Sequence, residues 1–209
     1  TVYNLEIGPG KVLNLGNALV LNLFAGMTYK NNGNIIGPST GMDIWIHTGD
    51  QTIILGNTDV NLVRFYLHGS ADANRVVTLG SDTEIRRNLV VNSTHASNTL
   101  TLDTGGHSLS VGWNMTMHPR TKLVAGSSTI SVGCRLDISR GAFDEGTSSV
   151  IMTGAHRPAG HLSYLPAILM ADGQMFYDLT ITGKVSYWTD ITVSHTLTVA
   201  SGASLTHFY

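Results

Sequence analysis

Apolar residues recur at two-residue spacing in short steps along most of the chain. Residues 179–208 divide into blocks of six, each opening with an apolar–x–apolar pair, such as Leu179/Ile181 or Leu197/Val199, and closing with small or polar residues. Residues i and i+2 of a strand lie on one face of a sheet. Strands this short leave no room for a hairpin or a helical crossover, so each must pair with the equivalent strand one coil above or below. The pattern predicts a β-solenoid.

The same pairs continue through the middle of the chain, with Gly, Ser, Asp and Asn in most gaps, as turns require. They include Val77/Leu79, Leu89/Val91, Leu100/Leu102, Leu109/Val111, Met115/Met117, Ile130/Val132 and Leu136/Ile138. We therefore predict an all-β, single-stranded parallel β-helix with three short strands per coil, forming one domain over residues 1–209. Uneven strand spacing and long insertions favour a right-handed helix over a left-handed one.

Two segments interrupt this pattern and are predicted to be loop excursions, near residues 24–50 and 155–175. The first is a loop by composition, because Asn, Gly, Pro and Ser dominate residues 30–41. The second contains Leu162–Met170, the one candidate for a helix, of at most two turns because Pro166 interrupts it.

The alternative all-β architecture is a β-sandwich or jelly roll, whose hairpins usually carry Asn-Gly or Asp-Gly turns. Here Asn32-Gly33 and Asp172-Gly173 both fall in the predicted excursions rather than between paired apolar runs. This placement favours the solenoid.

Composition narrows the function classes. Only 12% of residues are charged, against 42% hydrophobic, and 23 glycines with many Thr, Ser and Asn replace the missing charge. Such a surface is typical of stacked short strands and favours an extracellular, virion or cell-surface location. The net charge of −2 gives no electrostatic footprint for nucleic acid or anionic membrane. The single cysteine, Cys134, excludes an internal disulfide or a cysteine-rich zinc site.

A longer motif recurs along the chain. Phe176-Tyr177-x-Leu179-x-Ile181-x-Gly183 follows Gly141-Ala-Phe-Asp-Glu-Gly-Thr-Ser-Ser-Val-Ile-Met-Thr-Gly154 after a spacer. With these segments the chain resembles the β-solenoid repeats of bacterial surface adhesins and of phage fibre or other virion surface proteins. The resemblance covers residues 99–208 well and residues 1–98 more loosely. It implies a scaffold, and no catalytic residue belongs to the motif.

Candidate chemistry is sparse. Glycan cleavage needs two carboxylates about 5–9.5 Å apart, and the candidates are Asp82 with Glu84, on one strand face, and Asp144 with Glu145. For both pairs, the interpretation that we favour is that the carboxylates are ordinary solvated side chains without a catalytic role. His156 and His161 lack a flanking carboxylate or Cys at ligand spacing. We therefore predict no metal, no cofactor and no catalytic residue.

Exposed aromatic residues are the candidate binding groups, for a sugar or a neighbouring subunit: Trp113, Tyr164 and Trp188. Trp188 is expected to face outward if Val185 and Tyr187 face inward. Because a solenoid exposes unpaired backbone at both ends, we expect the ends to be covered by further polypeptide, by a partner or by copies of the chain.

These observations predict a structural, non-enzymatic β-solenoid of a virion or cell surface, such as a phage fibre, spike, decoration protein or adhesin stalk. It would act as a rigid assembly element through protein partners or self-association. The alternatives are a glycan-binding adhesin module and a tailspike-like glycan depolymerase.

Overall fold

The structure, a computed structural model, describes residues 5–16, 18, 20–24, 29–46, 50–69, 71–154 and 166–208. Every regular element in these ranges is a β-strand. All of the strand pairs formed there are parallel. The chain is therefore all-β with parallel pairing, as the two-residue periodicity predicted, and the antiparallel hairpins of a sandwich are not found among these strands.

The strands form three ladders, which we call A, B and C. Ladder A contains β2 (Val12–Asn14), the first parts of β5 (Asn34–Ile46) and β7 (Asn57–Leu67), β9 (Thr83–Ile85), β12 (Leu109–Val111), β15 (Thr129–Val132), β18 (Ser149–Met152), β20 (Met175–Ile181) and β22 (Thr192–Val199). Ladder B contains β3 (Val20–Phe24), the second parts of β5 and β7, β10 (Asn88–Ser93), β13 (Asn114–Met117), β16 (Arg135–Asp137), β19 (Ala167–Met170), β21 (Lys184–Tyr187) and β23 (Ser204–His207).

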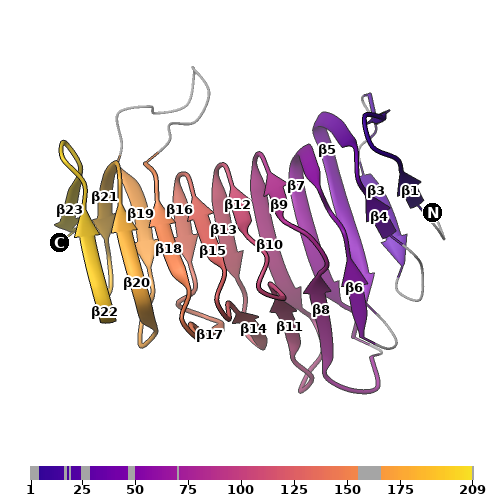
Figure 1. Cartoon of the computed structure of the whole chain (residues 1–209). Helices are drawn as coiled ribbons and strands as arrows, with labels where there is room; N and C mark the ends of the chain where they lie inside the picture. Colours follow the sequence, from indigo (N-terminus) through magenta and orange to yellow (C-terminus); the bar gives the residue numbers. More distant parts are fainter. Residues whose placement is uncertain are drawn as a thin grey trace.

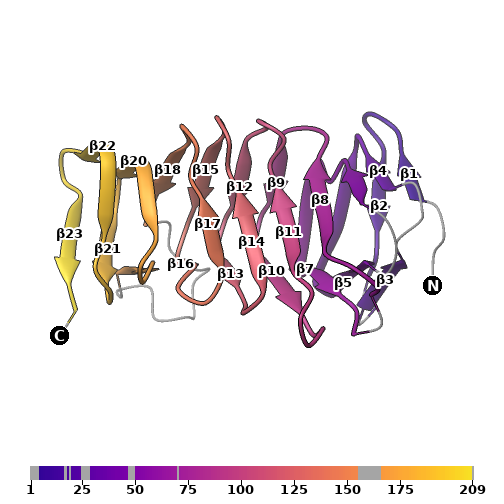
Figure 2. The same cartoon turned by 90° about the horizontal axis from the view of Figure 1, so that it is seen from below.

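Ladder C contains β6 (Gln51–Ile53), β8 (Arg75–Leu79), β11 (Leu100–Asp103), β14 (Thr121–Val124) and β17 (Ala142–Asp144), several of which lie in front in Figure 2. The pair formed by β1 (Leu5–Ile7) and β4 (Tyr29–Asn31) meets this ladder through a bridge between Lys30 and Ile54.

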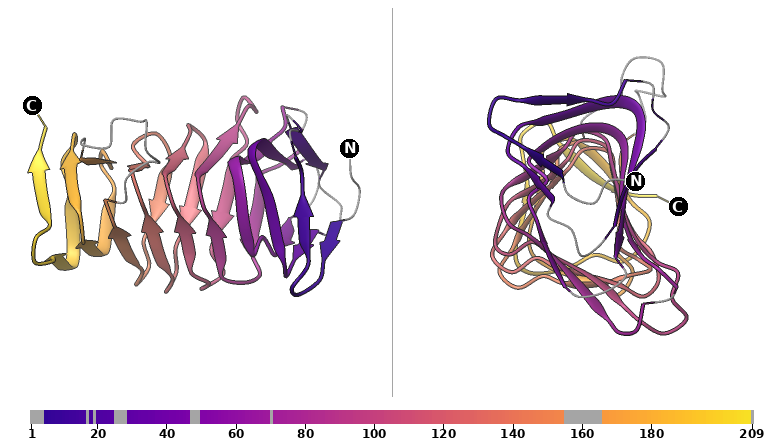
Figure 3. Two further views of the ribbon diagram at one scale, coloured as in Figure 1. Left: turned by 90° about the horizontal axis from the view of Figure 1, so that it is seen from above. Right: turned by 90° about the vertical axis from the view of Figure 1, so that its right-hand side faces the viewer.

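As far as β19 the chain passes through ladders C, A and B in that order, again and again, and beyond β19 the described strands alternate between ladders A and B. We call one such passage a circuit. Partner residues in ladder A lie between 17 positions apart, from Phe176 to Val193, and 29 positions apart, from Met152 to Ile181. Successive circuits follow one another along a single axis, so the first and last strands lie at opposite ends of the molecule (Figure 1). The left panel of Figure 3 shows the same progression from another side.

The predicted apolar pairs place their two side chains in the interior, except in the last circuit, where Leu197 and Val199 stay 50% and 46% exposed. In ladder B, Val63, Leu89, Met115, Leu136 and Leu169 stand over one another in register and are buried. Burial of each such side chain is worth roughly 1.5–3 kcal/mol. The end-on panel of Figure 3 shows the chain surrounding this common interior, which the apolar side chains fill.

The predicted excursion near residues 24–50 is wrong for most of its length. Residues 34–46 form the strand β5, which pairs with β2, β3 and β7. Composition misled here because Gly and Pro usually break strands. In β5 the register shifts between Gly37 and Gly41, and Pro38 lies within that shift, where no ladder donor is required.

The second predicted excursion, near residues 155–175, is settled only in part. Residues 155–165 lie outside the described ranges. Ala167–Met170, the end of the helix candidate, is the strand β19, and β20 begins at Met175. Leu169 is buried on Leu136, and its apolar neighbours therefore serve a strand rather than a helix face.

Candidate functional site

The C-terminal end carries an exposed aromatic stack. Trp188 follows β21 and Phe208 follows β23, one circuit later, and their rings lie 4.7 Å apart between centroids at an interplanar angle of 5°. Their exposed fractions are 48% and 51%. Trp188 thus points outward, as expected from the alternation with buried Val185.

Beside this stack the last circuit leaves its interior partly open. Tyr187, Ile191, Val193, Leu197 and Leu205 line a depression of about 570 Å³, with Asp190 at its edge. In interior circuits the equivalent side chains are covered by the next circuit, but the final one has a neighbour on one side only. The depression is therefore an unfilled portion of the core rather than a preformed ligand pocket with converging polar groups.

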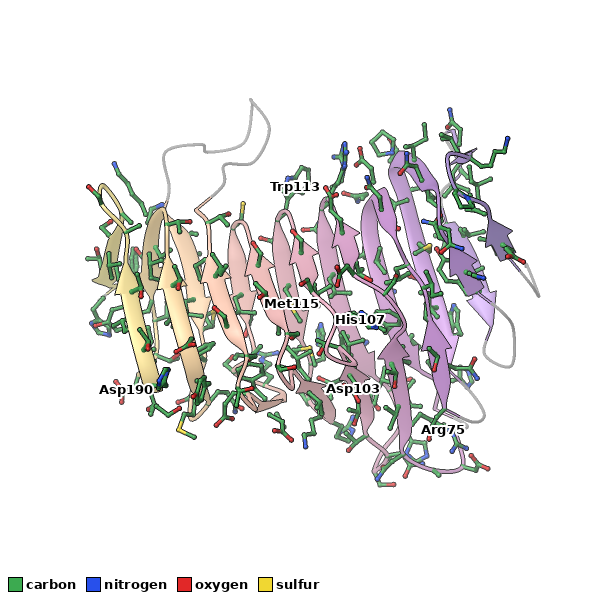
Figure 4. The ribbon with its side chains drawn as sticks, in the orientation of Figure 1. Arg75, Asp103, His107, Trp113, Met115 and Asp190 are labelled. Carbon is green, nitrogen blue, oxygen red and sulfur yellow. The ribbon has the colours of Figure 1, made fainter. Side chains whose placement is uncertain are left out.

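The other predicted aromatic binding residues behave differently. Trp113 stands at the rim between β12 and β13, outside the ribbons (Figure 4), and the Arg87 guanidinium lies 4.8 Å from its ring centroid. That cation–π contact already occupies one face of the indole. Tyr164 lies outside the described residues. The three candidates are thus not brought together: Trp188 sits at the end of the stack and Trp113 on its flank.

A polar groove runs along the corner between ladders C and A. Its volume is about 610 Å³, and amide, hydroxyl and carboxylate side chains from several circuits line it, among them Asn32, Asn34, Asn57, Asp82, Glu84 and Ser108. Gly33 and Gly56 form part of its wall. Gly56 has φ +55°, and a Cβ there would lie 2.3 Å from the Asn31 carbonyl oxygen, so the wall can be only backbone at this point.

The groove contains the carboxylate pair singled out by spacing. Asp82 and Glu84 flank buried Thr83 and both face outward, with side-chain exposures of 79% and 51%. Asp82 Oδ1 accepts a hydrogen bond from the Ser108 amide at 2.8 Å, and Glu84 Oε1 lies 3.4 Å from Arg86 Nε. Each carboxylate therefore has a partner, and both lie exposed among polar groups.

The second carboxylate pair is an ordinary surface feature. Asp144 accepts from Lys122 Nζ at 2.8 Å across ladder C, and the Glu145 carbonyl accepts from the Ser148 amide in a tight turn. The two residues lie at the corner after β17, where Gly146 adopts φ +54°.

Metal-binding geometry is not found in the part of the chain that the structure describes: no three His, Cys, Asp or Glu side chains come together. His156 and His161 fall outside that part. Two His–carboxylate contacts join described residues: His107 Nδ1 lies 3.8 Å from Asp82 Oδ1, and His195 Nδ1 lies 2.8 Å from Asp178 Oδ1, with the Tyr177 ring stacked on the His195 imidazole at 4.6 Å. The hydrogen bond from His195 holds the pKa of Asp178 below its ordinary value.

Sequence reasoning missed an outward aromatic cluster on ladder B. Trp45 lies between inward-facing Ile44 and Ile46, packs at 4.4 Å from Tyr66, and donates from Nε1 to Asn22 Oδ1 at 3.1 Å. The alternation of Ile44 and Ile46 was the available signal, because it places the residue between them on the outer face.

The comparisons with known proteins add no relative. No family model matches the chain, and neither a curated protein nor a solved structure does. Within the described residues no helix could cross a membrane. The resemblance to adhesin and virion surface repeats consequently stays a prediction that depends on the motif residues alone.

Proposed function

We propose that the chain is a right-handed β-solenoid that serves as a structural, non-enzymatic element of a virion or cell surface, with its two ends as contact surfaces. Parallel ladders that the chain visits in a fixed order support the solenoid. A parallel crossover is right-handed in nearly all known cases, which supports the hand.

One observation carries the functional part of the proposal. Among the described residues, every exposed large apolar side chain lies in the first two or the last two circuits, and the circuits between them present none. These side chains are Val12, Val20 and Ile36 at one end and Met175, Trp188, Leu197, Val199 and Phe208 at the other. Exposed apolar patches mark interaction surfaces. The terminal circuits thus carry the exposed apolar side chains of the described surface, which suits them to contact with a partner.

Immunogold electron microscopy tests this proposal on the source material. Antibodies raised against the folded chain should label intact particles or cells at surface projections. Antibodies against the denatured chain serve as the matched control for epitopes that the fold hides. Labelling confined to the interior, visible only after sectioning or permeabilisation, would contradict the proposed location and role.

The polar groove favours a second candidate, a glycan-binding module. Amide, hydroxyl and carboxylate groups along one groove can hydrogen-bond to the hydroxyls of an extended saccharide. The double variant Asp82→Asn/Glu84→Gln should then lose binding on an oligosaccharide array, whereas Asp144→Asn, remote from the groove, should keep it. Cleavage of a polysaccharide by the unmodified chain, abolished in the double variant, would instead favour the depolymerase.

A further inference from the structure

The two ends of the stack present complementary strand edges. β22 and β23 pair with β20 and β21, and β2 and β3 pair with β5, each through one edge only within the described residues. In a parallel ladder the free edge at the last circuit has the polarity that the free edge at the first circuit can continue. A second copy of the chain therefore offers a strand edge of the required direction for both ladders at once.

The corner between ladders A and B has the same length at both ends. Eight positions separate Leu13 from Leu21 in the first circuit, and eight separate Val199 from His207 in the last. These residues occupy corresponding columns, because the registers from Leu13 to Val199 and from Leu21 to His207 run unbroken through the stack.

Interior circuits have corners of other lengths: seven positions from Ile35 to Met42, five from Thr58 to Val63, six from Ile181 to Tyr187, and 17 from Met152 to Leu169, and the corner is tightest in the middle of the stack. Only four positions separate Ile85 from Leu89, and the interval is again four from Val111 to Met115 and from Val132 to Leu136. In the length of the corner between ladders A and B, the last circuit thus matches the first circuit of a second copy better than it matches the middle circuits of its own stack.

The residues that would meet are mostly apolar or β-branched. If the registers continue, Val199 falls on Leu13 and Thr198 on Val12 in ladder A, while Thr206 falls on Val20 and His207 on Leu21 in ladder B. β-Branched and aliphatic neighbours stabilise adjacent strands. No like charges oppose one another at these four positions. The contact would also cover the depression beside Leu197 and Leu205.

We propose that the C-terminal circuit of one copy stacks on the N-terminal circuit of another, with β22 continuing onto β2 and β23 onto β3 in parallel. This inference rests on the proposed function and names its partner, a second copy. Such a contact joins different surfaces of the two copies and does not close, so it produces linear polymers.

Two complementary variants test whether the C-terminal circuit of one copy contacts the N-terminal circuit of another. Val199→Lys blocks the C-terminal surface and Leu13→Lys the N-terminal one, because stacking would bury an unpaired ammonium group. Sedimentation velocity should show concentration-dependent polymers for the unmodified chain, a monomer for each variant alone, and a 1:1 dimer when the two are mixed. Ser131→Lys, on the outer face of the interior strand β15, is the matched control and should still polymerise.

Disulfide trapping keeps the test independent of any local unfolding caused by lysine. With Cys134 replaced by Ser, a Thr198→Cys copy mixed with a Val12→Cys copy should give an oxidised heterodimer, since neighbouring strands place paired Cα atoms within disulfide range. The Thr198→Cys copy mixed with a Ser131→Cys copy should not.

Other outcomes overturn the inference. An unmodified chain that stays monomeric at all concentrations contradicts it, as does a Leu13→Lys variant that dimerises by itself, which would indicate a two-fold contact between C-terminal ends. Neither result would affect surface labelling of the source material, so a failure of the stacking inference is distinguishable from a failure of the proposed function.

Discussion

At the scale of single residues, Asn31 connects two circuits through its side chain. Its Nδ2 donates to the carbonyl oxygens of Leu55 at 2.7 Å and Asn57 at 3.3 Å, and its Oδ1 accepts from the Gly33 amide at 3.0 Å. The side chain is fully buried, so no water can replace these bonds. Asn31 thereby fixes the backbone at the corner that forms the wall of the polar groove.

Replacing Asn31 by Ala should lower the free energy of unfolding by about 2–4 kcal/mol, because backbone groups at the corner lose their partners while still buried. Urea denaturation measures this change. The neighbouring exposed Asn32→Ala variant is the control and should stay within about 0.5 kcal/mol of the unmodified chain. Equal effects of the two substitutions would show that the side-chain bonds of Asn31 contribute nothing specific.

The sequence could not reveal this role. Asn31 precedes Asn32-Gly33, a combination typical of turns, and its partner Leu55 is 24 positions away. Two-residue periodicity identifies which apolar side chains face inward, but it does not say which polar residue meets which carbonyl in the next circuit. That depends on the number of residues in the intervening corners.

At the scale of elements, the corner turns depend on glycine for two separable reasons. Gly126 and Gly146 follow β14 and β17, with φ of +58° and +54°. A Cβ on Gly126 would meet nothing within 4 Å, whereas one on Gly146 would lie 2.4 Å from the Gly126 carbonyl oxygen. Left-handed backbone is thus needed at both turns, and close approach of backbone at the second.

Replacing Gly126 and Gly146 by Ala should lower the free energy of unfolding by different amounts. Gly126→Ala should destabilise the chain by about 1–2 kcal/mol, the cost of left-handed backbone for a residue with a Cβ. Gly146→Ala should cost about 1–3 kcal/mol more, because the added methyl group also forces the two turns apart. Urea denaturation of both variants gives the difference, and identical losses would mean that the corner relaxes freely.

Strands were more predictable than corners. The pairs Leu100/Leu102 and Leu109/Val111 lie on β11 and β12, where their spacing predicted strands. The segment 34–46 was misjudged because its Gly and Pro residues mark a register shift inside a long strand, and composition alone does not distinguish a shift from a loop. Period-2 patterning is local, but the accommodation of Pro38 depends on β7, which pairs with β5 on both sides of the shift.

At the scale of the whole molecule, stability should vary along the stack. Each circuit contacts mainly its two neighbours, so a terminal circuit has half of the support of an interior one. Leu136, in the interior of ladder B, is buried, whereas Leu205 in the last circuit is only partly so.

Leu136→Ala should therefore cost about 2–5 kcal/mol, and Leu205→Ala less than half as much, when both are measured by denaturation at concentrations where the chain is monomeric. Hydrogen exchange supplies the spatial check: amides of β23 should exchange faster than those of β13. Uniform protection along the stack would indicate one cooperative unit without weak ends.

Features of the whole molecule also differ in whether the sequence predicted them. Parallel all-β pairing followed from strands too short to turn back on themselves. The polar groove did not, because its walls come from several circuits, and Asp82 meets Ser108 from 26 positions away. The spacing of Asp82 and Glu84 placed both carboxylates on one face and could not supply the other walls.

The connection between β18 and β19 has a separate implication. Leu136 and Leu169 are 33 positions apart, yet they pair directly, and ladder B continues through them without a change of register. The register of ladder B therefore does not depend on the number of residues that connect β18 to β19. Register at this point is instead determined where the strands meet: Arg135 lies on Ile168, Leu136 on Leu169 and Asp137 on Met170, so proximity in the sequence is not what selects the partner.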